Sequence, residues 1–231
     1  MSNGFEYYYN NVPGKGLCRN NLIYTSLISK DRKTFCQWYY NDKTYHSGMN
    51  KVVDPTLMLE KWQREKHYLL LMHENFPQHI PEILDIDDKN QKIYLRIDGD
   101  DFWERAKTDI NRYNDVLPNW EEQMLEIIES HKKLNFYKIS MHPSSYFVVD
   151  GKLKSINYFF CYNFSEETIR FSDVFSHISD DRLEKLYPLM KKMNIDYNNQ
   201  EPLEKIQNLA FETFKFNFPH STMEKAKRIY V

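Results

Sequence analysis

The order of the predicted strands and helices limits the folds open to this chain of 231 residues. The segments NLIYTSLIS and TFCQWYYND are rich in β-branched and aromatic residues and flank the polar turn KDRK, which predicts a β-hairpin. The later segment IPEILDIDDKNQKIYLRIDG predicts two more strands joined by DDKNQ. Residues 55–74, between the two strand pairs, predict a helix, because Asp54 can cap its start and Pro55 suits its first turn.

The predicted helix at residues 55–74 carries a stripe of apolar residues at helical spacing, and Glu65 has charged neighbours. Such a stripe is typical of a helix that packs against a core. Its members are Leu59, Trp62, Leu69 and Met72.

The chain beyond residue 101 is predicted to be mainly helical. In NWEEQMLEIIESHKKLN, Asn119 is followed three residues later by Glu122, which is an N-cap signature. The apolar stripe of this helix consists of Met124, Ile127, Ile128 and Leu134. SDDRLEKLYPLMKKM and EPLEKIQNLAFETFKF predict two further helices, and Pro188 is expected to kink or end the first of them.

One hairpin interrupts the helical part. The segment KISMHPSSYFVVDGKLKSINYFF, within residues 138–160, predicts two short strands joined by a turn at Asp150-Gly151. The chain is therefore expected to be an α+β protein with two lobes and a cleft between them. Residues 1–100 would form the small antiparallel sheet lobe with one helix, and residues 102–231 the short, mainly helical lobe.

Composition excludes several classes of function. Lys and Arg number 31 and Asp and Glu 33, so a net charge of -2 makes a nucleic-acid partner unexpected. The three cysteines form no CxxC pair, and the sequence predicts neither a signal peptide nor a membrane span. A cytoplasmic location is expected. The excess of Asn, Lys, Ile, Tyr and Phe is typical of an A/T-rich genome and points to a viral, phage or parasite source, which would mean the host cytoplasm.

The order of elements resembles the protein-kinase-like superfamily, in particular its atypical and small-molecule kinases, over residues 22–175. LEKWQREKHYLLLMHENFPQHIPEILDIDDKNQKIYLRIDG is similar to the regulatory helix, the following strands and a hinge near residues 96–101, with Glu65 at the position of the helix glutamate. HKKLNFYKISMHPSSYFVVDGKLKSINYF is similar to the catalytic and metal-binding loops, with His142-Pro143 where these kinases carry His-Pro.

The resemblance implies ATP and Mg²⁺ as cofactors, but the side chains at the matching positions are neutral. Ser140 stands for the catalytic Asp, Ser145 for the metal-binding Asn, Asn157 for the metal-loop Asp and Gln37 for the strand lysine. The implied catalytic positions are Ser140, His142 and Asn157, the cofactor-binding positions are Gln37, Glu65 and Ser145, and the metal position is Asn157.

The roles of three of these neighbours stay open at this point. His142 can hold the loop through a backbone carbonyl or act as an acid or base. Lys138 can contact a phosphate or face solvent, and Glu65 can pair with another cation or face water.

Phosphoryl transfer depends on charged groups that position the phosphates and the metal ion. The leading hypothesis is thus a degenerate kinase, or pseudokinase, that binds a ligand or a protein partner. An alternative is a divergent, active phosphotransferase that transfers a phosphoryl group from ATP to a sugar, lipid or protein hydroxyl. A further alternative is an interaction protein without a nucleotide site, its cleft filled by Trp38, Tyr39 and Phe159.

Overall fold

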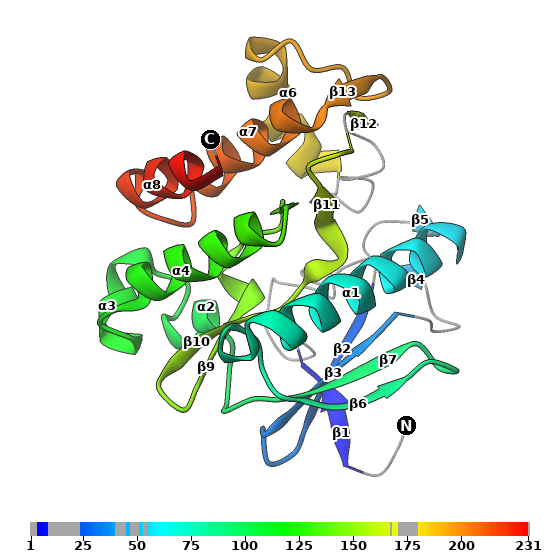
Figure 1. Ribbon diagram of the computed structural model, residues 1–231, viewed down its shortest axis with the longest axis vertical. Coiled ribbons are helices and arrows are strands. Elements are labelled where there is room, and N and C mark those ends of the chain that lie inside the picture. Colours follow the sequence, from blue (N-terminus) through cyan, green and yellow to red (C-terminus); the bar gives the residue numbers. More distant parts are fainter. Residues whose placement is uncertain are drawn as a thin grey trace.

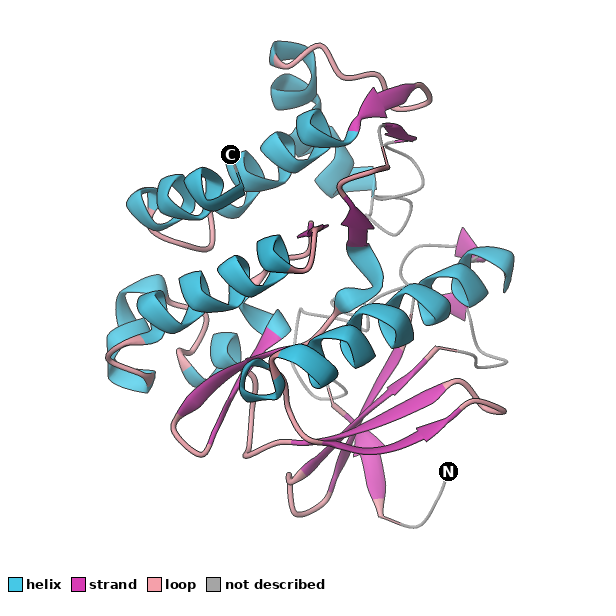
Figure 2. Cartoon of the chain, viewed as in Figure 1, coloured by secondary structure: helices cyan, strands magenta, loops and turns pink. Residues whose placement is uncertain are grey.

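The computed structural model describes residues 4–8, 24–39, 45–46, 51–52, 55–166, 168–170 and 180–230. These parts of the chain form a mixed α/β fold with a five-stranded antiparallel sheet and seven α-helices. The sheet lies at one end of the molecule and helices α7 and α8 at the other, with α1 and α4 between them (Figure 1). The large sheet lies at one end, whereas the short strand pairs, among them β9 with β10 and β12 with β13, lie among the helices (Figure 2).

The sheet has the strand order β1-β2-β3-β7-β6, and every neighbouring pair is antiparallel. Both predicted strand pairs are confirmed, since β2 pairs with β3 and β6 with β7. In β3, Phe35 lies opposite Leu95 and Gln37 opposite Ile93. The strands are β1 (Phe5–Tyr7), β2 (Thr25–Ser29), β3 (Thr34–Trp38), β6 (Ile83–Asp87) and β7 (Lys92–Arg96). A separate pair joins β4 (Tyr45–His46) to β5 (Lys51–Val52).

Helix α1 (Pro55–Asn75) confirms the helix predicted between the two strand pairs, and η2 (Pro77–His79) follows it. Trp62, Leu69 and Met72 are buried, as expected, but Leu59 is 42 % exposed and was wrongly assigned to the apolar side. With 3.6 residues per turn, the buried arc is centred on Glu65, and Leu59 projects beyond its edge. Glu65 is fully buried and does not share the exposure of its charged neighbours. The predicted cap Asp54 lies outside the described residues.

Helix α4 (Trp120–Lys133) begins after Asn119 as predicted, but the Asn119 side chain does not cap it. Asn119 has φ -106° and ψ 30°, outside the extended region that a capping residue needs, and its Oδ1 accepts from Nε2 of Gln123. Met124, Ile127 and Ile128 are buried and Leu134 partly buried. Pro188 neither begins nor ends α6 (Asp180–Lys192) but lies inside it. The remaining helices are α2 (Phe102–Arg105), η3 (Ile110–Arg112), α3 (Tyr113–Val116), α7 (Leu203–Phe214) and α8 (His220–Tyr230).

The predicted hairpin next to α4 is confirmed as β9 (Tyr146–Val149) paired with β10 (Lys152–Ser155). Asp150 (φ +51°) and Gly151 (φ +70°) both have positive φ, as the tight two-residue turn of a hairpin requires. Before it, β8 (Phe136–Lys138) pairs with β11 (Cys161–Asn163). This pairing brings the loop that contains η4 (Pro143–Ser145) close to η5 (Tyr158–Phe160). A last pair joins β12 (Thr168–Arg170) to β13 (Gln200–Pro202).

Two clusters of buried apolar residues stabilise the fold. One runs from the sheet and α1 through residues 136–162 to α6 and α7, and the other lies among α2, α3, α4 and α8. The boundary predicted near residue 101 stays a prediction. Within the described residues, none of the helices combines the length and the apolar character needed to span a membrane.

Candidate functional site

Asn157 is the centre of a buried chain of hydrogen bonds that joins the sheet to the loop before β9. Its backbone is left-handed (φ +67°), a conformation that asparagine adopts more readily than most residues, and its side chain is buried. Its Oδ1 accepts from the Tyr24 hydroxyl at 2.6 Å and from Nε2 of Gln37 at 3.0 Å. Its Nδ2 donates to Oγ of Ser145 at 2.9 Å. These bonds fix the orientation of the amide, with its oxygen toward the sheet and its nitrogen toward the loop.

Ser140 and Ser145 continue this chain of hydrogen bonds on the loop between β8 and β9. Their hydroxyl oxygens are 3.5 Å apart. The Ser145 amide donates to the His142 carbonyl at 2.7 Å, and the Ser145 carbonyl accepts from the Ile156 amide at 2.9 Å, so the loop is tied to the end of β10. The structure thus brings together four of the predicted site residues, namely Gln37, Ser140, Ser145 and Asn157.

The His142 ring stabilises the loop itself. Its Nδ1 accepts from the Ser144 amide at 3.1 Å and lies 2.7 Å from Ser144 Oγ, so the imidazole caps η4. The ring also packs edge-on against Trp103, with 5.6 Å between centroids. This geometry favours the loop-holding role over the acid–base role, with a backbone amide as partner where a carbonyl was expected.

Glu65 supplies a buried carboxylate next to this polar chain. Its Oε2 accepts from the Tyr39 hydroxyl at 2.9 Å and from the Phe159 amide at 2.8 Å. Its Oε1 has no hydrogen-bond partner within the described residues. Burial raises the pKa of Glu65 to about 7, although the Tyr39 hydrogen bond and the charge of Lys138 act in the opposite direction. Glu65 therefore anchors η5 to α1 and does not face water.

Lys138 is a buried cation that the sequence pattern did not distinguish from a solvated lysine. Its ammonium donates to the Ser140 carbonyl and lies 5.6 Å from the ring centroids of Tyr146 and Tyr158. Burial lowers the pKa of Lys138 to about 8, and interactions with Cys161 and Glu65 oppose that shift. One signal could have revealed its position, because Phe136 stands two residues earlier in the same strand and points to the same face.

Aromatic rings cover the sheet side of the Asn157 chain. Tyr24, Tyr39 and Phe159 are all buried, with ring centroids 5.3 Å apart for Tyr24 and Tyr39 and 5.7 Å apart for Tyr24 and Phe159. Tyr39 and Phe159, two of the aromatic residues expected to fill a cleft, both lie in this buried layer. Trp38 is not part of it, because successive residues of β3 point to opposite faces, and its ring lies under the Lys92 ammonium at 4.6 Å.

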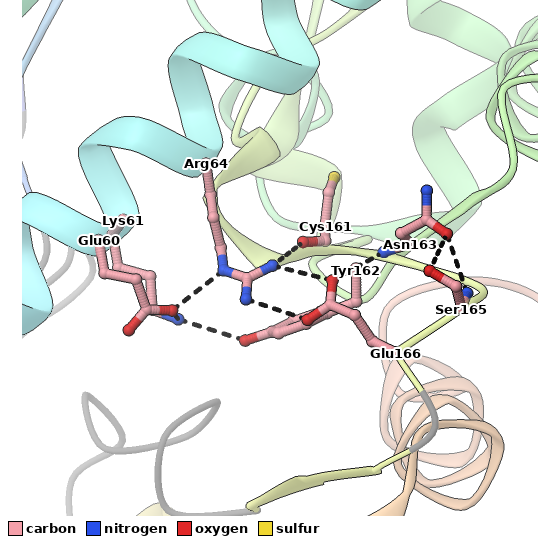
Figure 3. Close-up of polar contacts among 8 residues, drawn as sticks. All are labelled: Glu60, Lys61, Arg64, Cys161, Tyr162, Asn163, Ser165 and Glu166. Atoms are coloured by element: carbon pink, nitrogen blue, oxygen red, sulfur yellow. Dashed lines mark hydrogen bonds and ion pairs between the residues drawn. The ribbon is translucent and has the colours of Figure 1, made fainter.

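Arg64 fastens α1 to the segment that follows Asn157 (Figure 3). Its guanidinium donates to the Cys161 carbonyl at 3.0 Å and forms a two-point contact with Glu166 at 3.2 and 3.1 Å. It also donates to Glu60 at 3.0 Å and lies 4.3 Å from the Tyr162 ring centroid. Planar two-point pairing between arginine and a carboxylate is among the stronger polar contacts in proteins. Strand β11 is therefore held against α1 at several points.

Lys61 strengthens the same junction one turn earlier in α1. Its side chain is fully buried, its ammonium donates to the Tyr162 hydroxyl at 3.2 Å, and it lies 5.2 Å from the Phe160 ring centroid. Beyond β11, Asn163 Oδ1 accepts from both the amide and the hydroxyl of Ser165, which closes the turn before Glu166 (Figure 3). No sequence signal separated Lys61 and Arg64 from the other charged residues of α1.

The residues present do not fit a magnesium ion. Mg²⁺ prefers carboxylate and water oxygens in octahedral geometry. Here the oxygen of Asn157 already accepts two hydrogen bonds, and Ser145 Oγ accepts from the Asn157 amide. The buried acid Glu65 is turned toward Tyr39 and Phe159. Elsewhere in the described parts of the chain, no group of three or more His, Cys, Asp or Glu residues could hold a metal ion.

A surface pocket of about 430 Å³ lies away from this site, between the first turns of α4 and α8. None of the site residues predicted from the sequence lines it. Its walls are formed by Asn114, Pro118, Asn119, Trp120, Glu121, Glu122, Pro219, Ser221 and Thr222.

The groups around Asn157 are neutral hydrogen-bonding groups, while Glu65 and Lys138 are held by partners of their own. No protein-family model matches the chain, and no curated protein matches it at a significant level. Its function is therefore inferred from the geometry of these residues.

Proposed function

We propose that this chain is a pseudokinase, a protein of kinase-like fold that does not transfer phosphoryl groups and acts by binding a ligand, such as a nucleotide, or a protein partner. The two-lobed arrangement belongs to this proposal, with a sheet lobe over residues 1–100, a hinge near residues 96–101 and a helical lobe over residues 102–231. The proposal is supported by the hydrogen bonds that join Gln37, Ser140, Ser145 and Asn157, which the resemblance assigns to one site. Glu65 lies beside them and is bonded to Phe159.

The bonding of Asn157 is the observation that carries the proposal. The position where the resemblance implies a metal-binding carboxylate holds an amide, whose oxygen accepts from Tyr24 and Gln37 and whose nitrogen donates to Ser145. A buried amide whose oxygen and nitrogen both have hydrogen-bond partners is stable as it stands. A metal ion bound at Oδ1 of Asn157 would compete with the bonds from Tyr24 and Gln37.

The loss of charge argues against efficient catalysis. Replacing one group that stabilises the transition state or transfers its proton costs on the order of 10²–10⁴ in rate. Three positions at which the resemblance implies a charged side chain, those of Gln37, Ser140 and Asn157, carry neutral side chains here. The individual losses need not add, but recovery would require charged groups elsewhere in the site. The two buried ions near it, Glu65 and Lys138, are engaged with the protein itself.

A nucleotide assay tests the loss of activity directly. The wild-type protein is incubated with ATP and Mg²⁺, and both phosphate release and melting temperature are measured. No turnover above background and no Mg²⁺-dependent rise in melting temperature are expected. Turnover that disappears in both Ser140→Ala and Asn157→Ala but persists in Ser221→Ala would overturn the proposal. Ser221 is a suitable control because it is exposed on α8, away from the site. That outcome would favour the active phosphotransferase acting on a sugar, lipid or protein hydroxyl.

A second candidate, an interaction protein with no nucleotide site, is favoured by the aromatic layer. Tyr24, Tyr39 and Phe159 pack against each other over the Asn157 chain. Titration with a fluorescent ATP analogue without Mg²⁺ separates the two candidates. Saturable binding that unlabelled ATP competes away identifies a nucleotide-binding pseudokinase, and no binding identifies the interaction protein.

We infer that the partner is a protein and the compartment the cytoplasm, or the host cytoplasm for a viral chain. The free, buried thiols of Cys36 and Cys161 are compatible with a reducing environment. The net charge of -2 gives no attraction toward nucleic acid.

A further inference from the structure

Tyr8, directly after the edge strand β1, makes two hydrogen bonds to one residue far along the chain. Its hydroxyl oxygen accepts from the Asp101 amide at 2.7 Å, and its proton is donated to Asp101 Oδ2 at 3.2 Å. Asp101 is fully buried and also caps α2 through Oδ1, which accepts from the Glu104 amide. The donor and the acceptor that face Tyr8 are therefore fixed in place by the fold.

The ring of Tyr8 lies between two phenylalanines from different elements. Its centroid is 5.5 Å from Phe35 on β3, edge-on, and 6.4 Å from Phe147 on β9. Phe35 and Phe147 also contact each other at 5.2 Å, and both are buried. The Arg32 guanidinium lies 5.8 Å from the Tyr8 centroid on a further side. Aromatic walls with one fixed donor and one fixed acceptor are the general composition of a ligand pocket for a ring.

Tyr8 is less deeply buried than the residues that surround its ring. Tyr8 is partly buried, whereas Phe35, Phe147 and Asp101 are at most 2 % exposed. Among the described residues it follows a three-residue edge strand that pairs with β2, and the Tyr8 amide continues this pairing by donating to the Ser26 carbonyl at 3.0 Å. Short edge strands with few contacts open at low free-energy cost compared with a buried core. Burial and the carboxylates of Asp101 and Asp100 raise the pKa of Tyr8, so its hydroxyl stays protonated and can donate.

We propose that Phe35, Phe147 and Asp101 form a binding site for a phenol-like ring, and that Tyr8 is its built-in ligand. When the segment of residues 4–8 leaves, the site takes a small phenol, with the same two bonds to Asp101. The inference stands apart from the proposed function, because it depends on the Tyr8 contacts and not on Asn157.

Chemical rescue tests the site. Tyr8→Ala removes the ring and is expected to lower the melting temperature, and added p-cresol, the free form of the tyrosine side chain, is expected to raise it again. Toluene fills the same space without a hydroxyl and cannot replace the oxygen that accepts from the Asp101 amide, so its Kd should be about 3- to 10-fold weaker, as one net hydrogen bond implies. Tyr8→Phe keeps the ring in place and serves as the matched control, in which p-cresol should cause no shift.

Two results would overturn the proposal. One is a p-cresol effect on Tyr8→Ala no larger than on Tyr8→Phe, and the other is equal stabilisation by toluene and p-cresol. If Tyr8→Ala does not fold alone, refolding in the presence of each compound gives the same readout. Recovery with p-cresol but not toluene supports the site, and no recovery with either contradicts it. The ATP assay uses the wild-type chain, so its outcome is read independently.

Discussion

Glu65→Gln is expected to change how the stability of this protein depends on pH. Glu65 is fully buried, and its Oε2 accepts from the Tyr39 hydroxyl and the Phe159 amide. Glutamine has almost the same shape and retains an oxygen that can accept both bonds. The substitution therefore removes a titratable proton and a charge while it leaves the packing of α1 nearly unchanged.

The magnitude follows from the raised pKa. Burial raises the pKa of Glu65 from 4.5 to about 7, and such a shift corresponds to about 3 kcal/mol. In the unfolded chain Glu65 loses its proton near pH 4.5, whereas in the folded chain it keeps the proton to about pH 7. The folded state binds more protons in this window, so the wild-type free energy of unfolding falls as pH rises through it. A glutamine at this position does not titrate and cannot contribute to that fall.

The assay is urea denaturation of the wild type and of Glu65→Gln from pH 4.5 to pH 8. The free energy of unfolding of the variant, relative to that of the wild type, is expected to increase from pH 4.5 to pH 8. The increase should reach up to about 3 kcal/mol. The new amide nitrogen near the unpaired Oε1 position adds a cost of about 1–3 kcal/mol. That cost is the same at every pH, so the slope of the difference carries the result.

Glu60→Gln is the matched control on the same helix. Burial alone would raise the pKa of Glu60, but Lys61 and Arg64 outweigh it and lower the pKa. The free energy of unfolding of Glu60→Gln, relative to that of the wild type, should therefore increase as pH falls, whereas for Glu65→Gln it increases as pH rises. The effect at Glu60 should be small because its side chain is 46 % exposed. A pH-independent difference for Glu65→Gln would refute the burial of a titrating carboxylate at this place.

Three further substitutions test the site and the fold. Asn157→Ala should destabilise the protein by roughly 2–4 kcal/mol in urea denaturation, because buried partners lose their bonds; a loss below about 0.5 kcal/mol would contradict the network. Arg64→Met should speed amide hydrogen exchange in residues 158–166, while Arg96→Met, which removes a surface ion pair worth at most about 1 kcal/mol, should leave exchange there unchanged; equal exchange rates in the two variants would argue against Arg64 holding β11 to α1. Gly151→Ala, at φ +70°, should lower the melting temperature by a few degrees, at a cost of about 1 kcal/mol, and an unchanged value would exclude the left-handed turn.

The features that sequence predicted well are those encoded over a few residues. The strand pairs around KDRK and DDKNQ and the hairpin at Asp150-Gly151 follow from alternating apolar residues and a turn that needs positive φ. The convergence of Gln37 with Asn157 also agrees with the expected order of elements. The expected cap at Asn119 was wrong because a suitable residue type does not guarantee the backbone angles that capping needs.

The ionic groups of the site could not be placed from sequence. Glu65 and Lys138 each look like surface residues within their own segments, and their burial results from contacts with distant elements. Tyr24 was missed for a different reason, because the chain contains 17 tyrosines and composition alone does not single one out. Its role depends on a hydrogen bond across 133 positions of the chain.

The register of strand β3 affects contacts in three parts of the molecule. Every second residue, namely Phe35, Gln37 and Tyr39, points to the same face. Phe35 packs against the Tyr8 ring, Gln37 donates to the Asn157 amide oxygen, and Tyr39 donates to the Glu65 carboxylate. Three separate contacts thus share one register. Deleting a single residue from the turn at residues 30–33 would present Thr34, Cys36 and Trp38 to that face instead. One small error in strand pairing would then disconnect all three at once, so all three contacts depend on the length of this turn.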